Sequence, residues 1–362
     1  MSKRPTIKDV AKLAGVSIAT VSNVMSGSKP VNADLRERVE GAARALSYQI
    51  DRSASRLRSG QTKVVGVLVP DLDDTFFTSL VSRLEVMAGK DGYDVVVASS
   101  RDDVELEKSR LSALLGWRPA GLVAVPCSDT VPAILVNEAH RLPMVLADRV
   151  ISGSADIDSV TIDNFEAGEI AARHLVSLGH RDVVIAASNL SISPIRERVR
   201  GAETFMHAAV GVAPIVVELG SNGERGAEIF AHWLERNTCP TAVIALTNVT
   251  TLSVLSTLAA RHVAMPEQVS IIGFDDYAWM SARKAAVTAI RQPIDEMARM
   301  VWDRLRARML GDTSPPHLIE LNATLQVRNS VSNLLGPHSR DADLTVPQAT
   351  NVASAKGRKS VH

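Results

Sequence analysis

The chain has 362 residues, of which 46% are hydrophobic and 22% charged, and its formal net charge at pH 7 is zero. This length predicts two or three domains, and the composition excludes a mostly disordered, collagen-like or coiled-coil chain. There is no run of about 18 apolar residues, and the charged first ten residues are not followed by an apolar stretch. We therefore expect neither a membrane span nor a secretory signal, and place the protein in the cytoplasm.

The two cysteines, Cys127 and Cys239, lie far apart in the sequence and belong to no CxxC pair. This spacing argues against a disulfide framework and against a cysteine-based metal site. We expect two buried thiols, no bound metal and no other cofactor.

Charge is divided unevenly along the chain. Residues 1–62 carry 11 Lys and Arg against 5 Asp and Glu, whereas residues 63–362 carry 29 against 35. A small basic head on a larger acidic body is typical of a polyanion-binding module attached to a separate globular domain.

Three short helices are predicted in the basic head. The first begins after Thr6 and ends at Gly15, and the second spans 18–25 with Ser17 as its cap. The third opens at Asn32 and repeats its apolar residues at helical spacing. Two short helices joined by a glycine turn, with a third to close the core, are the parts of a helix-turn-helix, whose second helix reads the major groove.

Residues 6–48, TIKDVAKLAGVSIATVSNVMSGSKPVNADLRERVEGAARALSY, closely resemble the DNA-binding head of the LacI/GalR family of bacterial repressors. The DNA contacts implied by this resemblance are Thr6, Ser17, Ile18, Ala19, Thr20, Ser22 and Asn23. Of these, Ile18, Ala19 and Asn23 occupy base-reading positions, and an asparagine can pair with adenine N6 and N7. The alternative is an ordinary three-helix bundle with a solvated basic face.

A hinge segment, helical on operator DNA in that family, is expected at residues 49–62. The DNA contacts it would supply are Arg52, Ala54, Arg56 and Leu57. The resemblance makes Leu57 a wedge between base steps of the minor groove, although packing against the body is its alternative role. The chain has Ile50-Asp51 where family members usually have Pro-Asn, so the hinge lacks the stiffness of proline.

From residue 63 onward, β-branched runs alternate with amphipathic helical stretches, a pattern typical of parallel sheets with crossover helices. The expected strands are 64–69, 94–99, 121–125 and 144–147 in a first series, and 159–162, 183–187, 214–218, 241–246 and 269–274 in a second. We predict an all-α helix-turn-helix head (1–48) joined by the hinge to an α/β effector-binding and dimerisation body (63–330). This body consists of two doubly wound parallel-sheet lobes, about 63–150 and 151–330, with crossovers between them.

Ligands of such sheets bind beyond the carboxyl ends of the strands. The side chains that follow the expected strands there are Phe76, Phe77, Asp148, Arg149, Asp163, Asn164, Asn248, Asp275 and Asp276. Carboxylates, an amide and an aromatic pair converging on a cleft between the lobes would suit a small polyhydroxylated ligand. For each Asp or Asn, a helix N-cap is an equally good interpretation.

The body resembles the effector domain of the same family, which is akin to periplasmic sugar-binding proteins, and the resemblance rests on FFTSLVSRLEVMAGKDGYDVVVASS, HLVSLGHRDVVI, RERVRGAETF, VAMPEQVSIIGFDD and TAIRQPIDEMA. It implies that Arg198 grips effector oxygens, that Asp275 is the ligand-binding carboxylate and that Phe76 forms an aromatic wall. An ion pair of Arg198 with Asp148 or Asp163 is the structural alternative.

Two positions depart from the family pattern. Val249 follows Asn248 where the family usually has Asp, and Ser221 stands where some members place a stacking aromatic residue. Trp279 could stack on a sugar instead, or belong to the core. The lactose or purine ligand set therefore cannot be copied onto this chain.

These observations predict a DNA-binding transcriptional regulator, most often a repressor in this family, controlled by a small effector, either a sugar or a sugar derivative. Its expected partners are a second copy of itself and a pseudo-palindromic double-stranded operator, to which it would bind at the nucleoid. Residues 331–362 are expected to be disordered, without the leucine heptads that make some relatives tetramers.

The alternatives are a nucleoside or purine effector acting as co-repressor, and a solute-binding protein. A solute-binding protein would carry a signal peptide and no helix-turn-helix. The sequence contains no GxGxxG, GxxxxGK[ST], HExxH or GxSxG motif, so we expect no enzymatic activity.

Overall fold

The structure is a computed structural model that describes residues 5–26, 30–48, 62–149, 156–282 and 284–336. The expected hinge contacts Arg52, Ala54, Arg56 and Leu57 lie outside these residues, as does most of the expected tail. The body divides into two compact units, and the chain passes between them three times, after Ile162, Gln292 and Leu321.

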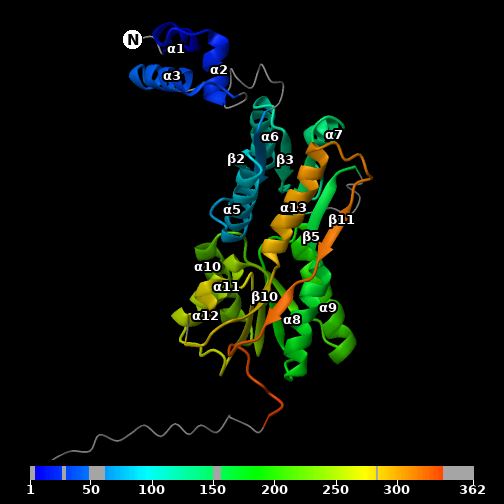
Figure 1. Cartoon of the computed structure of the whole chain (residues 1–362). Coiled ribbons are helices and arrows are strands. Elements are labelled where there is room, and N and C mark those ends of the chain that lie inside the picture. The colour runs from blue at the N-terminus through cyan, green and yellow to red at the C-terminus, as the bar shows by residue number, and fades with distance from the viewer. Residues whose placement is uncertain (1–4, 27–29, 49–61, 150–155, 283, 337–362) are drawn as a thin grey trace, which may run out of the picture. The chain divides into compact units, whose positions relative to one another are not determined.

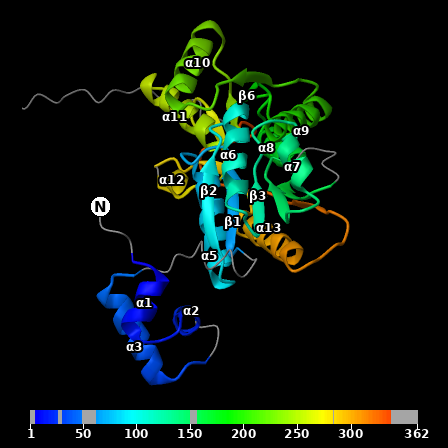
Figure 2. The ribbon, with the colours of Figure 1, turned by 90° about the horizontal axis from the view of Figure 1, so that it is seen from above.

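The head contains the three predicted helices, α1 (Ile7–Ala14), α2 (Ile18–Ser26) and α3 (Ala33–Ala45). They are the blue helices of Figures 1 and 2. One buried cluster holds them together, and its residues are Val10, Ala11, Ala14, Val21, Val39, Ala42 and Ala43. All of its core residues come from these three helices, with Tyr48 packed against them.

Unit 1 is built on a parallel six-stranded sheet in the order β11-β5-β4-β3-β1-β2. Its strands are β1 (Val64–Val69), β2 (Asp94–Ser99), β3 (Gly121–Ala124), β4 (Met144–Ala147), β5 (Asp158–Ile162) and β11 (Leu318–Leu321). Its helices are α5 (Thr75–Lys90), α6 (Val104–Gly116), α7 (Ala133–Glu138) and α13 (Ile294–Met309). Helix α13 lies more than 200 residues after α5 in the sequence but packs beside it (Figure 1).

Unit 2 repeats the plan with a sheet in the order β12-β10-β9-β8-β6-β7, in which only β12 runs antiparallel to its neighbour. Its strands are β6 (Val183–Ala187), β7 (Ile215–Glu218), β8 (Ala242–Ala245), β9 (Ser270–Phe274), β10 (Thr288–Arg291) and β12 (Thr324–Gln326). Its helices are α8 (Asn164–Ser177), α9 (Ser193–Val210), α10 (Gly223–Arg236), α11 (Asn248–Ala260) and α12 (Ala278–Ser281). Helices α10 and α11 pack side by side (Figure 2).

The predicted fold class is confirmed, with a helical head and two doubly wound α/β lobes. One strand assignment was wrong. The run 159–162, expected to open the second series, pairs with β4 and β11 in the sheet of unit 1. The change of unit therefore comes after Ile162, close to the start of α8.

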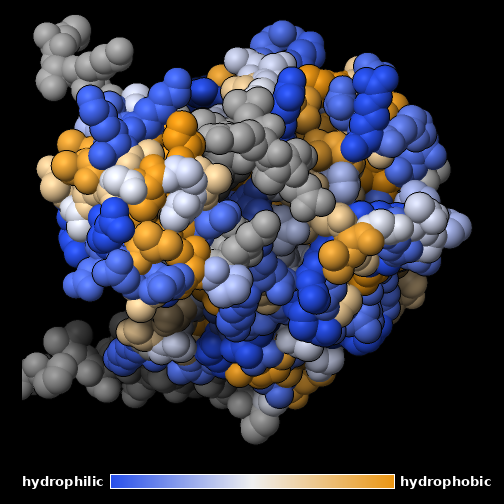
Figure 3. Space-filling model, turned by 45° about the horizontal axis from the view of Figure 1, so that its top comes forward, coloured by the Kyte–Doolittle hydropathy of each residue, from blue (hydrophilic) through white to orange (hydrophobic). Residues whose placement is uncertain are grey.

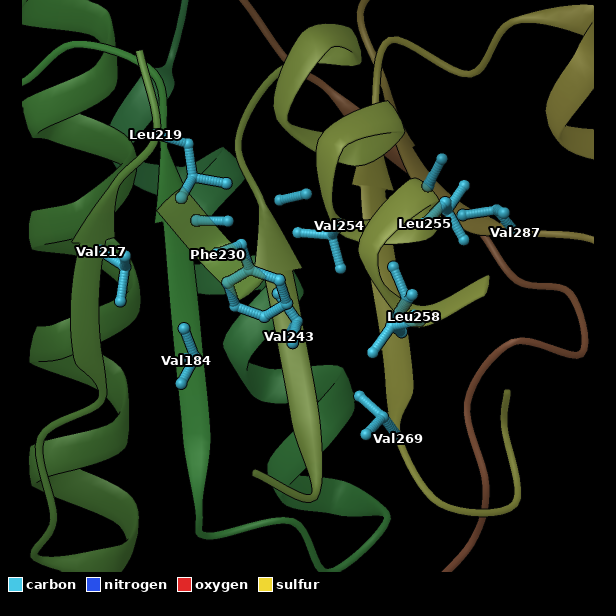
Figure 4. Packing of buried hydrophobic residues seen from close by; sticks show 14 of the residues in the cluster. Val184, Val217, Leu219, Phe230, Val243, Val254, Leu255, Leu258, Val269 and Val287 are labelled. Carbon is cyan, nitrogen blue, oxygen red and sulfur yellow. The ribbon is translucent and has the colours of Figure 1, made fainter. Parts of the chain in front are cut away.

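Central strands such as β1 and β8 are buried throughout and wholly apolar apart from Gly66, as in a parallel sheet covered by helices on both faces. Figure 4 shows part of the core of unit 2, where the fully buried ring of Phe230 lies among aliphatic side chains of β6, β8 and α11. On the face viewed in Figure 3, hydrophilic residues surround smaller hydrophobic areas. Among the described residues, no helix is both long and apolar enough to cross a membrane.

The segment after β12 is fastened to unit 2 by hydroxyl groups and one imidazole. The hydroxyl of Ser330 accepts from the N–H of Thr288 at 2.7 Å and donates to the carbonyl of Ile271 at 2.6 Å. The Nε2 atom of His180 lies 3.0 Å from the carbonyl oxygen of Ser332. Since that oxygen can only accept, Nε2 carries the proton and donates it.

We predict that the folded protein loses stability in acid, because burial disfavours a charged imidazole at this place. Burial lowers the pKa of His180, and burial also lowers the pKa of the nearby His174. The unfolded chain takes up these protons near pH 6.5, whereas the folded chain resists them until a lower pH. The contribution of the two histidines to the free energy of unfolding should therefore be constant above about pH 7 and fall as the pH drops through about 6.5.

Urea melts at pH 7.5, 6.5 and 5.5 measure this dependence. His180→Gln should make the loss of stability shallower, and adding His174→Gln should flatten it further. A His180→Gln protein with the full pH dependence of the wild type would contradict the assignment.

Candidate functional site

The second helix of the head presents small and apolar side chains outward. Ile18 is 39% exposed and Ala19 is exposed, whereas Val21 on the opposite side is fully buried. Asn23 is partly exposed one turn further along. The structure therefore displays two of the three expected base-reading side chains and leaves Asn23 partly accessible.

The remaining head residues from the sequence analysis shape the helix ends. The N–H and hydroxyl of Thr6 donate to the carboxylate of Asp9 at 2.8 and 2.7 Å, which fixes the start of α1. The hydroxyl of Ser17 accepts from the N–H of Thr20 at 3.1 Å and caps α2. Ser22 is partly exposed on α2.

In unit 1, an aromatic pair and an arginine come together. Phe76 and Phe77 open α5, are each 5% exposed, and meet edge to face with ring centroids 5.2 Å apart. The guanidinium of Arg149 lies 5.6 Å from the Phe77 ring centroid and forms an ion pair with Asp102. The sequence analysis placed Arg149 after an expected strand but did not consider Asp102.

Asp148 follows β4 in a left-handed backbone conformation, with φ of +59°. Its N–H donates to the carbonyl of Val160 and its carbonyl accepts from the hydroxyl of Thr161, each at 2.8 Å. A left-handed non-glycine residue that surrounding bonds hold in place is typical of functional sites.

In unit 2, Arg198 is 4% exposed, and two neutral oxygen atoms accept hydrogen bonds from its guanidinium. Its Nε donates to Oδ1 of Asn164 at 2.8 Å, and its Nη1 donates to the carbonyl of Leu246 at 2.7 Å. Its guanidinium lies 3.8 Å from the ring centroid of Phe274, within reach of a cation–π interaction. Asn164, which the sequence analysis placed directly after an expected strand, is thus the residue that orients Arg198.

This position depends on an unusually close approach of α8 and α9. A Cβ atom on Gly168 would lie 1.9 Å from the carbonyl oxygen of Arg198, and one on Gly201 would lie 2.0 Å from the carbonyl oxygen of Phe165. Only glycine fits at either place, because the clashing atoms belong to backbone. The contact places the backbone of Arg198 against Gly168, one turn after Asn164 at the start of α8.

Asp275 lies at the centre of a polar cluster that we call the acceptor cluster, made of Arg198, Asn248, Asp275 and Gln292. The carboxylate of Asp275 accepts from the side-chain N–H of Gln292 at 2.6 Å and from the backbone N–H of Asn248 at 3.2 Å. Arg198 joins it through Leu246, two residues before Asn248. The cluster lies where β8, β9 and β10 end.

The acceptor cluster contains two buried oxygen atoms without a hydrogen-bond partner among the described residues, Oδ1 of Asn248 and Oε1 of Gln292. A buried acceptor left in this state costs about 1–3 kcal/mol, so it indicates a site that a ligand or water completes. Gln292 was missed because it follows a four-residue strand that the sequence pattern did not reveal.

The turn at Asp275 and Asp276 has positive φ at both residues, +76° and +49°. Burial disfavours the charge of Asp276, but hydrogen bonds from Arg328 and Arg291 outweigh it and lower the pKa of this carboxyl. Two cations therefore hold the strained turn that presents Asp275.

Two nominated residues have visible structural roles. The carboxylate of Asp163 caps α8 by accepting from the N–H of Glu166 at 2.8 Å. Trp279, on α12, packs against the hydrophobic core of unit 2. Their part in ligand binding stays a prediction.

The cysteines differ in environment. Cys127 is buried as expected, and burial together with the neighbouring Glu107 raises its pKa to about 12. The expectation of a second buried thiol was wrong, because Cys239 is exposed in the loop before β8. No group of three potential metal-ligating side chains is found in the described part of the chain.

Two family models match the chain. Residues 6–51 match "Bacterial regulatory proteins, lacI family", and residues 62–331 match "Periplasmic binding proteins and sugar binding domain of LacI family". The first match covers the helices of the head and the second covers both units of the body.

Among curated proteins, the HTH-type transcriptional regulator PtxS of Pseudomonas putida is 31% identical over 332 residues, covering 91% of this chain and 96% of that protein. The HTH-type transcriptional repressor PurR of Actinobacillus pleuropneumoniae is 30% identical over 338 residues, with coverages of 91% and 99%.

Two solved structures are similar at 26% identity. The Lac repressor dimer bound to operator and the anti-inducer ONPF has a TM-score of 0.79 and covers 91% of this chain and 100% of its own. The complex of the transcriptional regulator CelR with cellobiose has a TM-score of 0.66, with coverages of 90% and 100%.

We predict that Asn23→Ala weakens specific DNA binding selectively. A lost base contact costs about 1–3 kcal/mol, whereas phosphate contacts and hence binding to random DNA survive. The measurement is a gel shift on DNA selected by the wild-type chain from a randomised pool, with random DNA as the control. Equal losses on both would remove Asn23 from the base-reading surface.

We also predict that Gly168→Ala separates α8 from α9. The added methyl meets backbone atoms that cannot turn aside, so the free energy of unfolding should fall by about 1–3 kcal/mol. The matched control is Gly89→Ala in α5, where a Cβ meets nothing within 4 Å and should be neutral or slightly stabilising. Thermal melts of the two variants make the comparison, and equal melting temperatures would contradict the prediction.

Proposed function

Because this chain belongs to the LacI family of bacterial regulatory proteins, and is thus a DNA-binding transcriptional repressor, we propose that a small polyhydroxylated molecule bound at the acceptor cluster controls its hold on DNA. The molecule is a sugar or a sugar derivative. The repressor acts as a homodimer on a pseudo-palindromic operator, since two heads are needed for two half-sites.

The unsatisfied oxygens of Asn248 and Gln292 carry the proposal. Together with the carboxylate of Asp275, they make the cluster rich in acceptors, with Arg198 as its cation. A ligand that completes such a site must bring hydrogen-bond donors and must also offer an acceptor to a guanidinium. Adjacent hydroxyl groups on one small molecule meet both requirements.

The similarity to CelR, solved with cellobiose, supports a carbohydrate. A purine is the second candidate, because relatives named PurR cover nearly the whole chain and a purine also carries N–H donors and ring acceptors. The two classes differ in number of donors, so direct binding measurements separate them.

For ligand binding to change DNA binding, the ligand must bind with different affinity to two states of the protein. Coupling of this kind is typically about 1–3 kcal/mol, or roughly 5–150-fold in affinity for DNA. An inducer would lower that affinity and a co-repressor would raise it, so measuring DNA binding with and without ligand gives the sign.

The test is a thermal-shift screen of the full chain against cellobiose, ribose, galactose, gluconate, adenine, guanine and hypoxanthine. A ligand at 100 times its Kd adds about 2.7 kcal/mol to the free energy of unfolding. We expect a shift with a carbohydrate, whereas a shift with purines alone would favour the second candidate.

Asp275→Asn should abolish that shift, because charge-assisted hydrogen bonds are about twice as strong as neutral ones. Asparagine keeps the shape of the side chain and tolerates the left-handed backbone at this position. The matched control is Asp303→Asn, which removes the same charge from an exposed position of α13. A stable Asp275→Asn protein with an unchanged shift would take Asp275 out of the site.

A further inference from the structure

Arg38 reaches from the third helix of the head to the turn that joins the other two. Its Nη2 donates to the carbonyl of Ala14 at 2.7 Å and lies 3.4 Å from the carbonyl of Gly15. The arginine and these carbonyls are 24 and 23 residues apart in the sequence. This contact links α3 directly to the helix-turn-helix turn.

The carbonyls at this turn need partners from outside α1. The last four carbonyls of a helix have none within it. Here the N–H groups of Val16 and Gly15 bond to the carbonyls of Ala11 and Lys12, and Arg38 donates to those of Ala14 and Gly15. A cation at this end also interacts favourably with the helix dipole.

Gly15 is fitted to this arginine. Its φ of +63° is left-handed, and a Cβ atom there would lie 2.9 Å from Nη2 of Arg38. The sequence analysis explained this glycine by the turn alone. The structure adds that a side chain here would displace the guanidinium.

We propose that Arg38 is a positioning residue for DNA reading, which sets the angle of α2 without contacting a base. Ile18 follows Gly15 by three residues, so a shift of the turn displaces Ile18 and Ala19, the exposed side chains at the start of α2. Base contacts depend on such placement, whereas attraction of Lys and Arg to phosphates does not.

The experiment uses the full chain and a DNA fragment selected by the wild type from a randomised pool. Arg38→Met, which keeps the aliphatic stem and removes the donors, should weaken binding to this fragment by roughly tenfold. Binding to random DNA and the slope of affinity against salt should stay as in the wild type. Arg36→Met, the same charge loss at an exposed position of α3, is the matched control.

Each other outcome overturns the proposal. Equal weakening on both DNAs, with a salt slope smaller by about 1, would make Arg38 a phosphate contact. Unchanged binding to the selected fragment would make the contact irrelevant to reading.

Hydrogen exchange of the same proteins separates positioning from general stabilisation. In Arg38→Met, residues 14–20 should exchange faster while residues 33–45 keep the wild-type rate. Faster exchange over the whole head would show that Arg38 only stabilises the fold. Arg38→Lys retains a charged donor, so it should recover part of the selective binding, and a loss as large as that of Arg38→Met would count against the proposal.

Discussion

The backbone contact between α8 and α9 is the constraint on which the acceptor cluster depends. Two glycines, Gly168 and Gly201, let each helix lie against a carbonyl of the other. Arg198 can then reach Asn164 and the carbonyl of Leu246 while its guanidinium covers Phe274. A buried guanidinium is tolerable only when its donors are used, so the helix spacing and the charge stabilise each other.

The body separates stability from function along each strand. The interiors of central strands such as β1 and β9 are buried and mostly apolar, and they need only the right periodicity. The residues just past the strands have energetically unfavourable backbone conformations, because Asp148, Asp275 and Asp276 are left-handed. Such conformations persist only when neighbouring groups hold them in place, and at Asp276 ion pairs with two arginines do so.

Most of the strands of the fold could be predicted from the sequence pattern, because apolar runs rich in β-branched residues, such as 64–69 and 183–187, are typical of buried strands. The strands β10, β11 and β12 were not predicted. β11 and β12 lie at the edges of their sheets, where partly exposed residues leave no continuous apolar run. The unit to which β5 belongs is decided by the strands that β5 pairs with, and these partners are distant in the sequence. Helical caps such as Asp163 were predictable from local chemistry, whereas the partner of Arg198 required knowing which helices touch.

The three passages between units also affect how the chain is made on the ribosome. The sheet of unit 1 is complete only with β11, and unit 2 is closed only by β12 and the segment after it. Neither unit can finish folding until nearly the whole body has emerged, whereas the head has its entire core within residues 7–48. Since domains fold as units during synthesis, a nascent chain displays a finished DNA-reading head well before it has a ligand site to govern it.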